Sequence, residues 1–199
     1  MTGFDAVILA NGLFPTAAVP LRLLREARCV VCCDGAACHW PQCDAVVGDG
    51  DSVPEELRNR LIQIDEQEDN DLTKATRYCL SKGMRRIAYL GATGRREDHT
   101  LGNISLMVRY AREMDVEPLM ATDEGWFVVS KGEASFESFT GQQVSIFNVD
   151  CRQLSSEGLK WASYPYDQLW QGTLNEALGS AFTLKGDGYY LVYRTYLPK

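Results

Sequence analysis

Six short apolar runs, separated by longer polar stretches, constrain the fold of the first 122 residues more than any other feature of the sequence. They are Ala6–Ala10, Cys29–Cys33, Ala45–Val47, Leu61–Ile64, Arg86–Leu90 and Pro118–Ala121. Runs that are this short and this apolar are typical of parallel strands buried on both faces of a sheet. We therefore expect a parallel sheet in this part of the chain.

Two stretches between these runs have helical periodicity. Residues 71–82 place Leu72, Ala75 and Cys79 on one face, and Gly83 follows at the position of a C-terminal cap. Residues 99–114 show the same spacing of apolar side chains. Strands that alternate with helices indicate an α/β fold, here a Rossmann-like doubly wound parallel sheet.

The pattern changes after about residue 122, where short β-rich pieces are divided by Gly, Asp and Ser. The pieces are Trp126–Ser130, Ala134–Phe139, Gln143–Phe147, Leu159–Ala162, Ala181–Leu184 and Tyr189–Tyr193. Such pieces are typical of a small antiparallel sandwich or barrel. We predict two domains, an α/β domain over residues 1–122 and a C-terminal antiparallel β-sandwich over residues 123–199.

The composition of the chain excludes several classes of protein. Its 199 residues carry a net charge of −7, which would repel a polyanion, so general nucleic-acid binding is disfavoured. No apolar run approaches the roughly 18 residues of a membrane helix, and the first ten residues are too short and acidic for a signal peptide. We expect a cytoplasmic protein without a membrane segment.

Five of the seven cysteines fall between Cys29 and Cys43, around His39. This clustering raises the alternative of a zinc site. However, Cys32 and Cys33 are adjacent, and no second Cys-x-x-Cys or His pair is present to complete a tetrahedral site. The favoured interpretation is that these cysteines are small buried hydrophobic residues on a strand.

Polar residues follow four of the apolar runs directly. The segments are Asn11-Gly12, Asp34-Gly35, Gly48–Ser52 and Gly91–Asp98. In an open α/β sheet, ligands bind beyond the carboxyl ends of the strands, so we expect all four segments to open onto one edge.

The segment Gly48–Ser52 contains two aspartates, Asp49 and Asp51, between glycines. It begins like a dinucleotide fingerprint, but Val53 occupies the third glycine position. Residues two apart on an extended segment point the same way, so both carboxylates are candidates for one Mg²⁺ ion shared with substrate phosphates. Asp71, at the start of the helix after the fourth run, is a third candidate ligand. The alternative is a turn that caps the next helix.

The stretch from Gly91 to Asn103 supplies the positive counterpart. Its glycines allow close backbone approach, Arg95 and Arg96 can clamp phosphate oxygens, and the following helix start presents free N–H groups. The alternative is a glycine-rich turn with two solvated arginines and Asp98 as the N-cap. The sequence contains neither a P-loop nor the Gly-x-Ser-x-Gly pattern of a hydrolase nucleophile.

Five segments taken in order, CDGAA, GDGDS, EQEDNDLTKA, GATGRREDHTLGN and GLKW, resemble the thiamine pyrophosphokinase family, and the resemblance runs from about Val7 to Tyr193. It implies an enzyme that transfers the pyrophosphoryl group of ATP to the hydroxyl of thiamine, giving thiamine diphosphate and AMP with Mg²⁺. It also implies an α/β nucleotide domain, a C-terminal β-sandwich that binds thiamine, and a homodimer whose active sites use both subunits.

The resemblance implies roles for individual residues. Catalytic roles fall to Asp71, Asp98 and Arg96; nucleotide binding to Asn11, Asp34, Gly35, Thr93, Gly94 and Arg95; substrate binding to Gln67, Asn103, Thr173 and Asn175; and metal binding to Asp49, Asp51 and Asp71. Either Asp98 or Asp71 is expected to accept the hydroxyl proton.

The chain departs from the family pattern in its C-terminal part. Leu174 stands where family members often have serine, and Val192 falls close to the place of a substrate-facing aromatic residue, for which Tyr190 or Tyr193 is a substitute. Two other functions stay open at this point. One is a pyrophosphokinase for another hydroxymethyl heterocycle, such as a pterin, and the other is a non-catalytic thiamine or nucleotide sensor.

Overall fold

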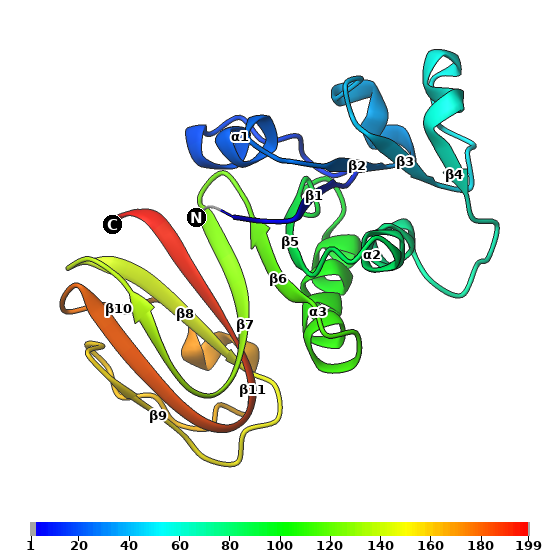
Figure 1. Cartoon of the computed structure of the whole chain (residues 1–199). Helices are drawn as coiled ribbons and strands as arrows, with labels where there is room; N and C mark the ends of the chain where they lie inside the picture. Colours follow the sequence, from blue (N-terminus) through cyan, green and yellow to red (C-terminus); the bar gives the residue numbers. More distant parts are fainter. Residues whose placement is uncertain (1–2, 199) are drawn as a thin grey trace. The chain divides into compact units, whose positions relative to one another are not determined.

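The computed structural model describes residues 3–198, which divide into two compact units, unit 1 up to Asp123 and unit 2 from Glu124 onward. The sheet of unit 1 is built from parallel strands and that of unit 2 from antiparallel strands (Figure 1).

Unit 1 is built on six parallel strands. They are β1 (Ala6–Leu9), β2 (Val30–Cys33), β3 (Ala45–Gly48), β4 (Leu61–Gln63), β5 (Arg86–Leu90) and β6 (Glu117–Ala121). Their order across the sheet is β6-β5-β1-β2-β3-β4, and every neighbouring pair is parallel. All residues of β1, β2 and β3 are buried, as expected for strands covered on both faces. The predicted doubly wound sheet is therefore confirmed.

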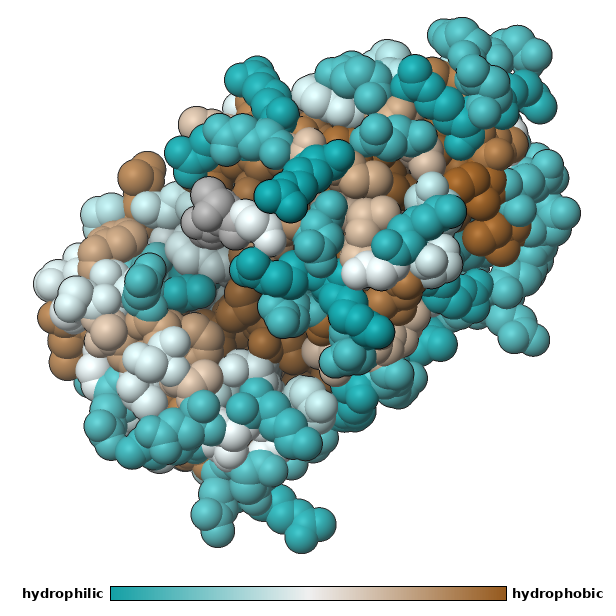
Figure 2. All heavy atoms as spheres, viewed as in Figure 1, coloured by the Kyte–Doolittle hydropathy of each residue, from teal (hydrophilic) through white to brown (hydrophobic). Residues whose placement is uncertain are grey.

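Three α-helices and two 3-10 helices connect these strands. They are α1 (Ala18–Arg25), η1 (Asp34–His39), η2 (Glu55–Arg60), α2 (Asp71–Ser81) and α3 (Glu97–Glu113). In Figure 1, α2 and α3 lie on one face of the sheet and α1 on the other. Figure 2 shows hydrophilic side chains over η2 and over the loop that follows β4.

The start of α2 follows from its sequence. The Asn70 side chain accepts hydrogen bonds from the Thr73 N–H at 3.0 Å and the Thr73 hydroxyl at 2.9 Å, which is a typical N-cap. At the other end Gly83 adopts φ +78°, the left-handed conformation that the predicted C-terminal cap requires. The N-cap at Asn70 places Asp71 in the first turn of the helix.

Unit 2 is antiparallel. Its elements are β7 (Gly125–Glu137), β8 (Gln142–Asn148), β9 (Leu154–Glu157), η3 (Leu169–Gly172), β10 (Asn175–Glu176) and β11 (Ala181–Pro198). The long strand β11 pairs along its first part with β9 and along its second part with β8, while β7 pairs with both parts. A register shift between Lys185 and Tyr189 separates the two parts. One strand thus serves both layers of the predicted sandwich.

The core of unit 2 shows the period of two that antiparallel strands produce. Val144 and Ile146 of β8 are fully buried, while Ser145 between them is half-buried. Phe182 and Tyr190 join this core from β11. The stretch Leu159–Ala162, predicted as a strand, forms only an isolated bridge at Leu159, so that prediction was wrong.

Candidate active site

A cavity of about 460 Å³ lies at the carboxyl ends of the strands of unit 1. The sheet order reverses at β1, and this switch point is where ligands bind in doubly wound folds. The lining of the cavity comes from the segments after β1, β2, β3 and β5 and from the start of α2. Among the lining residues are Asn11, Gly12, Asp34, Gly35, Ser52, Asn70, Asp71, Gly94, Arg95, Arg96, His99 and Asn103. The four polar segments therefore open onto one edge, as predicted.

Glycines let the segments after β1 and β5 approach each other closely. The Gly12 N–H donates to the Gly91 carbonyl at 2.7 Å, and a Cβ at Gly12 would lie 2.3 Å from that oxygen. Gly91 itself adopts φ +61°. A side chain at either position would separate the two segments, so the cavity floor depends on both glycines.

Asp34 is a buried carboxylate with an unused acceptor. Its residue is 8% exposed and adopts φ +31°, a conformation uncommon for a non-glycine residue. Oδ2 accepts the Ser52 N–H at 3.0 Å, while Oδ1 is buried and has no hydrogen-bond partner. A Cβ at Gly48 would lie 2.8 Å from the Cβ of Asp34, so the glycine makes room for this side chain. A buried acceptor left unpaired favours a cation or a ligand donor at this place.

Asp71 lies in the first turn of α2 and lines the same cavity. Burial raises the pKa of its carboxyl group; the Lys74 ammonium, 3.4 Å away, opposes this shift, and the charges of Asp34 and Asp49 add to it. The charges of two other carboxylates therefore act on Asp71, next to the buried ammonium of Lys74. The site has an excess of negative charge that a bound cation would relieve.

Asp49 and Asp51 do not lie on an extended segment. Strand β3 ends at Gly48, Gly50 adopts φ +90°, and the Asp49 carboxylate accepts the Asp51 N–H at 3.1 Å to close a turn. The expectation that alternation along a strand makes both side chains point the same way was therefore wrong. The turn brings the half-buried Asp49 and the exposed Asp51 to the edge of the sheet, although neither residue belongs to the lining of the cavity.

The arginine segment after β5 presents two guanidinium groups at the cavity. Arg95, at φ +66°, donates to the carbonyl and the side-chain oxygen of Asn11, both at 3.2 Å. Arg96 forms a two-pronged pair with Asp98, with distances of 3.1 Å from Nε and 2.6 Å from Nη2. The hydrogen bond from Arg96 and then that from the His99 N–H hold the pKa of Asp98 below its usual value. Arg96, rather than Asp98, is the N-cap of α3.

Three other predicted site residues of unit 1 differ in how they relate to the cavity. Asn103 lines the cavity, and its amide donates to the Ala92 carbonyl at 2.8 Å. The Thr93 carbonyl accepts the Leu13 N–H at 2.8 Å and so supports the cavity floor. The exposed Gln67 lies in the loop before α2 and does not line the cavity.

The aspartates fit a metal that is shared with a ligand. Within residues 3–198, no three His, Cys, Asp or Glu side chains converge closely enough to hold an ion between them. The unpaired Oδ1 of Asp34 and the raised pKa of Asp71 nevertheless indicate oxygen donors whose charge is not balanced. Mg²⁺ commonly binds one or two carboxylates and takes its other ligands from phosphates and water. The donor set fits that mode of binding.

One residue of the cysteine cluster, Cys33, lines this cavity. Cys32 and Cys33 are buried on β2 and Cys43 is buried before β3, in agreement with the favoured interpretation for these three. Cys29 is half-buried and Cys38 is exposed, with its thiol donating to the Gly35 carbonyl.

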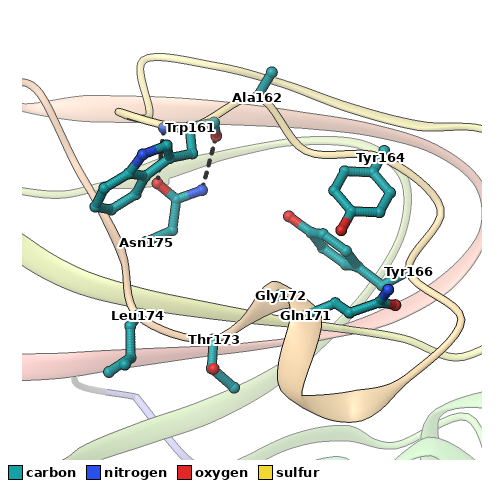
Figure 3. A pocket seen from close by; sticks show the side chains of 9 residues that line it. All are labelled: Trp161, Ala162, Tyr164, Tyr166, Gln171, Gly172, Thr173, Leu174 and Asn175. Atoms are coloured by element: carbon teal, nitrogen blue, oxygen red, sulfur yellow. Dashed lines mark hydrogen bonds between the residues drawn. The ribbon is translucent and has the colours of Figure 1, made fainter.

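Unit 2 contains a second cavity, of about 310 Å³, which Figure 3 shows from close by. The residues Trp161, Ala162, Tyr164, Tyr166, Gln171, Gly172, Thr173, Leu174 and Asn175 line it. In Figure 3 the Trp161 indole lies on one side and the rings of Tyr164 and Tyr166 on the other. None of the lining residues is charged, and aromatic faces attract cations and flat rings.

The two predicted substrate contacts in unit 2 both belong to this lining. The Thr173 hydroxyl donates to the Trp170 carbonyl at 2.6 Å. The Asn175 side chain is 4% exposed and bonds to the backbone of Trp161. Leu174, which replaces the family's serine, is 63% exposed and adopts φ +62°.

Sequence reasoning missed several residues that line the cavities. Asn70 and His99 in unit 1 and the rings of Trp161, Tyr164 and Tyr166 in unit 2 were not assigned to a site. Asn70 carries a recognisable signal, because an asparagine directly before an apolar helical period is a typical N-cap. The tyrosines lie in a stretch without regular secondary structure, where no periodicity indicates which way a side chain points.

A doubly wound sheet with carboxylates and arginines around its switch point is the arrangement of a nucleotide-dependent phosphotransferase. The family model of the thiamin pyrophosphokinase catalytic domain matches residues 21–117, and that of the thiamin pyrophosphokinase substrate-binding domain matches residues 125–193. The chain belongs to the thiamin pyrophosphokinase family, and it transfers the pyrophosphoryl group of ATP to thiamine. The enzyme thus acts in the formation of thiamine diphosphate.

Solved structures share this fold over almost the whole chain. Thiamine pyrophosphokinase from Bacillus subtilis is 20% identical, with a TM-score of 0.75 and coverage of 96% of this chain and 98% of that chain. The enzyme from Geobacillus thermodenitrificans is 22% identical, with a TM-score of 0.76 and coverage of 96% and 97%. Thiamin pyrophosphokinase from Candida albicans is 17% identical, with a TM-score of 0.75 and coverage of 96% and 89%. Among curated proteins, no sequence matches this chain significantly.

Proposed function

We propose that the reaction is divided between the two units, with ATP and Mg²⁺ bound in the cavity of unit 1 and thiamine bound in the cavity of unit 2. The observation that carries the proposal for unit 1 is the unpaired, buried Oδ1 of Asp34 in a cavity that Asp71 also lines. For unit 2 it is the uncharged aromatic lining, which lies within the stretch that matches the substrate-binding domain model.

Asp49, Asp51 and Asp71 would hold the Mg²⁺ ion. When it is bound, the ion neutralises charge on the phosphate oxygens of ATP. Support comes from the charges of Asp34 and Asp49, which lie near enough to Asp71 to add to the rise of its pKa. The Lys74 ammonium holds Asp71 from the protein side.

The other side chains of the cavity would orient the triphosphate. Arg95 and Arg96 supply cationic donors, and they lie next to the N-terminal end of α3, whose dipole favours an anion. The close approach of the segments after β1, β2 and β5 supports nucleotide binding by Asn11, Gly35, Thr93 and Gly94. Phosphoryl-type transfer depends on such positioning and charge balance more than on covalent catalysis.

Asp71 and Asp98 both stay candidates for the group that accepts the hydroxyl proton. Burial raises the pKa of Asp71, and a bound Mg²⁺ ion would oppose this shift. The hydrogen bond from Arg96 lowers the pKa of Asp98, and the same contact allows Asp98 to orient Arg96.

Thiamine carries a thiazolium cation and a pyrimidine ring. The indole of Trp161 and the ring of Tyr164 would contact these rings with their π-faces, since both side chains are about half exposed at the cavity. Thr173 keeps the lone pairs of its hydroxyl free to accept a hydrogen bond. Gln67 and Asn103 stay predicted substrate contacts.

Two further properties belong to this proposal. The resemblance to the family supports a homodimer, which sedimentation analysis of the purified protein would detect. A cytoplasmic location is supported by the seven cysteines, all of which are unpaired, as is usual in a reducing compartment. Within the described part of the chain, no helix is long and apolar enough to cross a membrane.

Equilibrium binding to two variants tests the division between the units. Asp71→Asn should weaken the binding of Mg²⁺-ATP about tenfold or more and leave thiamine binding unchanged, whereas Trp161→Ala should do the reverse. Trp170→Ala is the matched control, because this exposed tryptophan does not line the cavity. The proposal would be contradicted if Trp161→Ala lost ATP binding. It would also be contradicted if Asp71→Asn lost thiamine binding and kept ATP binding.

A further inference from the structure

Two short segments of unit 2 lie antiparallel around a bridge between Leu159 and Ala177. Beside this bridge, the Lys160 N–H donates to the Glu176 carbonyl at 2.9 Å. The regular ladder stops there. The next residue along the first segment is Trp161, which lines the cavity (Figure 3).

At Trp161 the side chain of Asn175 takes the place of a backbone partner. The Trp161 N–H donates to Oδ1 of Asn175 at 3.1 Å, and Nδ2 of Asn175 donates to the Trp161 carbonyl at 2.8 Å. Oδ1 also accepts the Glu176 N–H at 2.8 Å. Asn175 therefore binds both polar groups of the Trp161 backbone, as a neighbouring strand would.

These bonds leave the Asn175 side chain little capacity for a ligand. Both lone pairs of Oδ1 and one of the two N–H groups of Nδ2 are used, and the residue is 4% exposed. Trp161, by contrast, is 54% exposed. The buried Asn175 side chain therefore holds the Trp161 backbone in place, and the Trp161 side chain is the one that a ligand can reach.

The indole of Trp161 already interacts with a cation of the protein. Lys160 Nζ lies 4.9 Å from the ring centroid, and the Glu176 carboxylate holds this ammonium at 3.2 Å. A cation–π contact weakens quickly when the ring shifts away from the cation. The affinity of the ring for a substrate cation thus depends on how firmly the Trp161 backbone is held.

We propose that Asn175 is a positioning residue, which acts on thiamine through Trp161 and does not contact the substrate. The inference rests on the proposed thiamine site in unit 2 and reassigns Asn175 from the substrate-binding role that the sequence predicts. Its consequence is that Asn175 and Trp161 form one functional unit, so that loss of either removes the same interaction.

A double-mutant cycle tests this proposal. The KM for thiamine and kcat are measured at saturating ATP for Trp161→Ala, Asn175→Ala and the double variant. Each single variant should raise the KM for thiamine by about tenfold and change kcat by less than about twofold. The double variant should be no worse than Trp161→Ala, because Asn175 has nothing left to position.

The possible failures are distinguishable. Effects that multiply in the double variant, to about a hundredfold, would show that Asn175 contacts thiamine by itself and would overturn the inference. A normal KM in Asn175→Ala would also overturn it. A normal KM in Trp161→Ala would instead refute the proposed thiamine site and the inference with it.

Two additional variants separate positioning from general loss of structure. Ser138→Ala removes another bond from a side chain to the backbone of unit 2, that to the Gly179 carbonyl at 2.7 Å, and should leave the KM unchanged. Asn175→Asp keeps the acceptor and loses the Nδ2 donor. If Asn175→Ala does not fold, Asn175→Asp replaces it in the double-mutant cycle. Thiamine should quench tryptophan emission in the wild type, less at equal concentration in either Asn175 variant, and not at all in Trp161→Phe. Full quenching in a folded Asn175 variant would contradict the proposal.

Discussion

The ammonium of Lys74 lies 3.4 Å from the carboxylate of Asp71, and its side chain is only 3% exposed although the Asp71 side chain is 37% exposed. Both residues are on the first turns of α2. A buried cation is costly unless it is paired, so its presence indicates that the site needs a positive charge on the protein side of Asp71.

Replacement of Lys74 by methionine should impair nucleotide use without preventing folding, because methionine fills a similar volume. Without the ammonium, the charges of Asp34 and Asp49 raise the pKa of Asp71 further. We expect the KM for ATP to rise by about tenfold and the KM for thiamine to stay unchanged. Lys74→Arg, which keeps the charge, should be affected less. Steady-state kinetics with ATP varied would contradict this account if the methionine variant behaved like the wild type.

Asp49→Asn and Asp51→Asn should each lower kcat/KM by about a hundredfold or more, since an amide is a much weaker ligand for Mg²⁺ than a carboxylate. Raising the Mg²⁺ concentration should restore part of the activity. Glu55→Gln is the matched control, because its carboxylate is 86% exposed and pairs only with Arg58 among the interactions described. An aspartate variant with near-normal kinetics and an ordinary Mg²⁺ dependence would remove that residue from the proposed metal site.

Arg96→Lys should lower kcat/KM by about ten- to a hundredfold, because lysine cannot reproduce the two-pronged pair with Asp98 or a planar contact with phosphate. Arg85→Lys provides the comparison, since that arginine forms an exposed pair with Asp115. Similar kinetics for the two lysine variants would mean that Arg96 is only a solvated surface residue, the alternative that the sequence left open.

The stability of unit 1 should depend on the charge of Asp123. Burial raises the pKa of this carboxyl group, but hydrogen bonds from Thr16 and the Ala17 N–H outweigh it and bring the pKa below its ordinary value of 3.8. Because the folded pKa is below the unfolded one, the carboxylate stabilises the fold above about pH 4 and loses this effect as the pH falls through the folded pKa.

Asp123→Asn should therefore lower the free energy of unfolding by about 1 kcal/mol at pH 7. The difference from the wild type should shrink on acidification below pH 4 and become small near pH 2. Urea unfolding at several pH values measures this. A difference that stays constant down to pH 2 would show that the ionised form of Asp123 is not what stabilises these hydrogen bonds.

The sequence predicts the part of the site that depends on strand ends. The apolar runs determine where β1, β2, β3 and β5 end, and the residues that follow them line the cavity of unit 1. Helix α1 was not predicted, because it has only eight residues and the two N–H groups before it bond to Asp123, more than a hundred positions along the chain. No local pattern contains such a contact.

The geometry of the individual side chains was predicted less well. The turn that Gly50 makes at φ +90° replaces the extended geometry expected for Asp49 and Asp51. The role of Asn175 depends on pairing with a segment 14 positions earlier in the chain, which forms only a single bridge and leaves no period in the sequence. The spacing of the motifs therefore predicted which residues form the candidate site. The contacts that orient their side chains could be found only in the structure.

Product analysis with labelled ATP tests whether the enzyme transfers the pyrophosphoryl group of ATP to thiamine. The purified protein is incubated with Mg²⁺, thiamine and ATP that carries label at either the α- or the γ-phosphate. We expect the γ-label to appear in thiamine diphosphate and the α-label in AMP, in equal amounts, and we expect no product from a hydroxymethylpterin. Formation of ADP with thiamine monophosphate, or of AMP with the pterin but not with thiamine, would contradict this expectation.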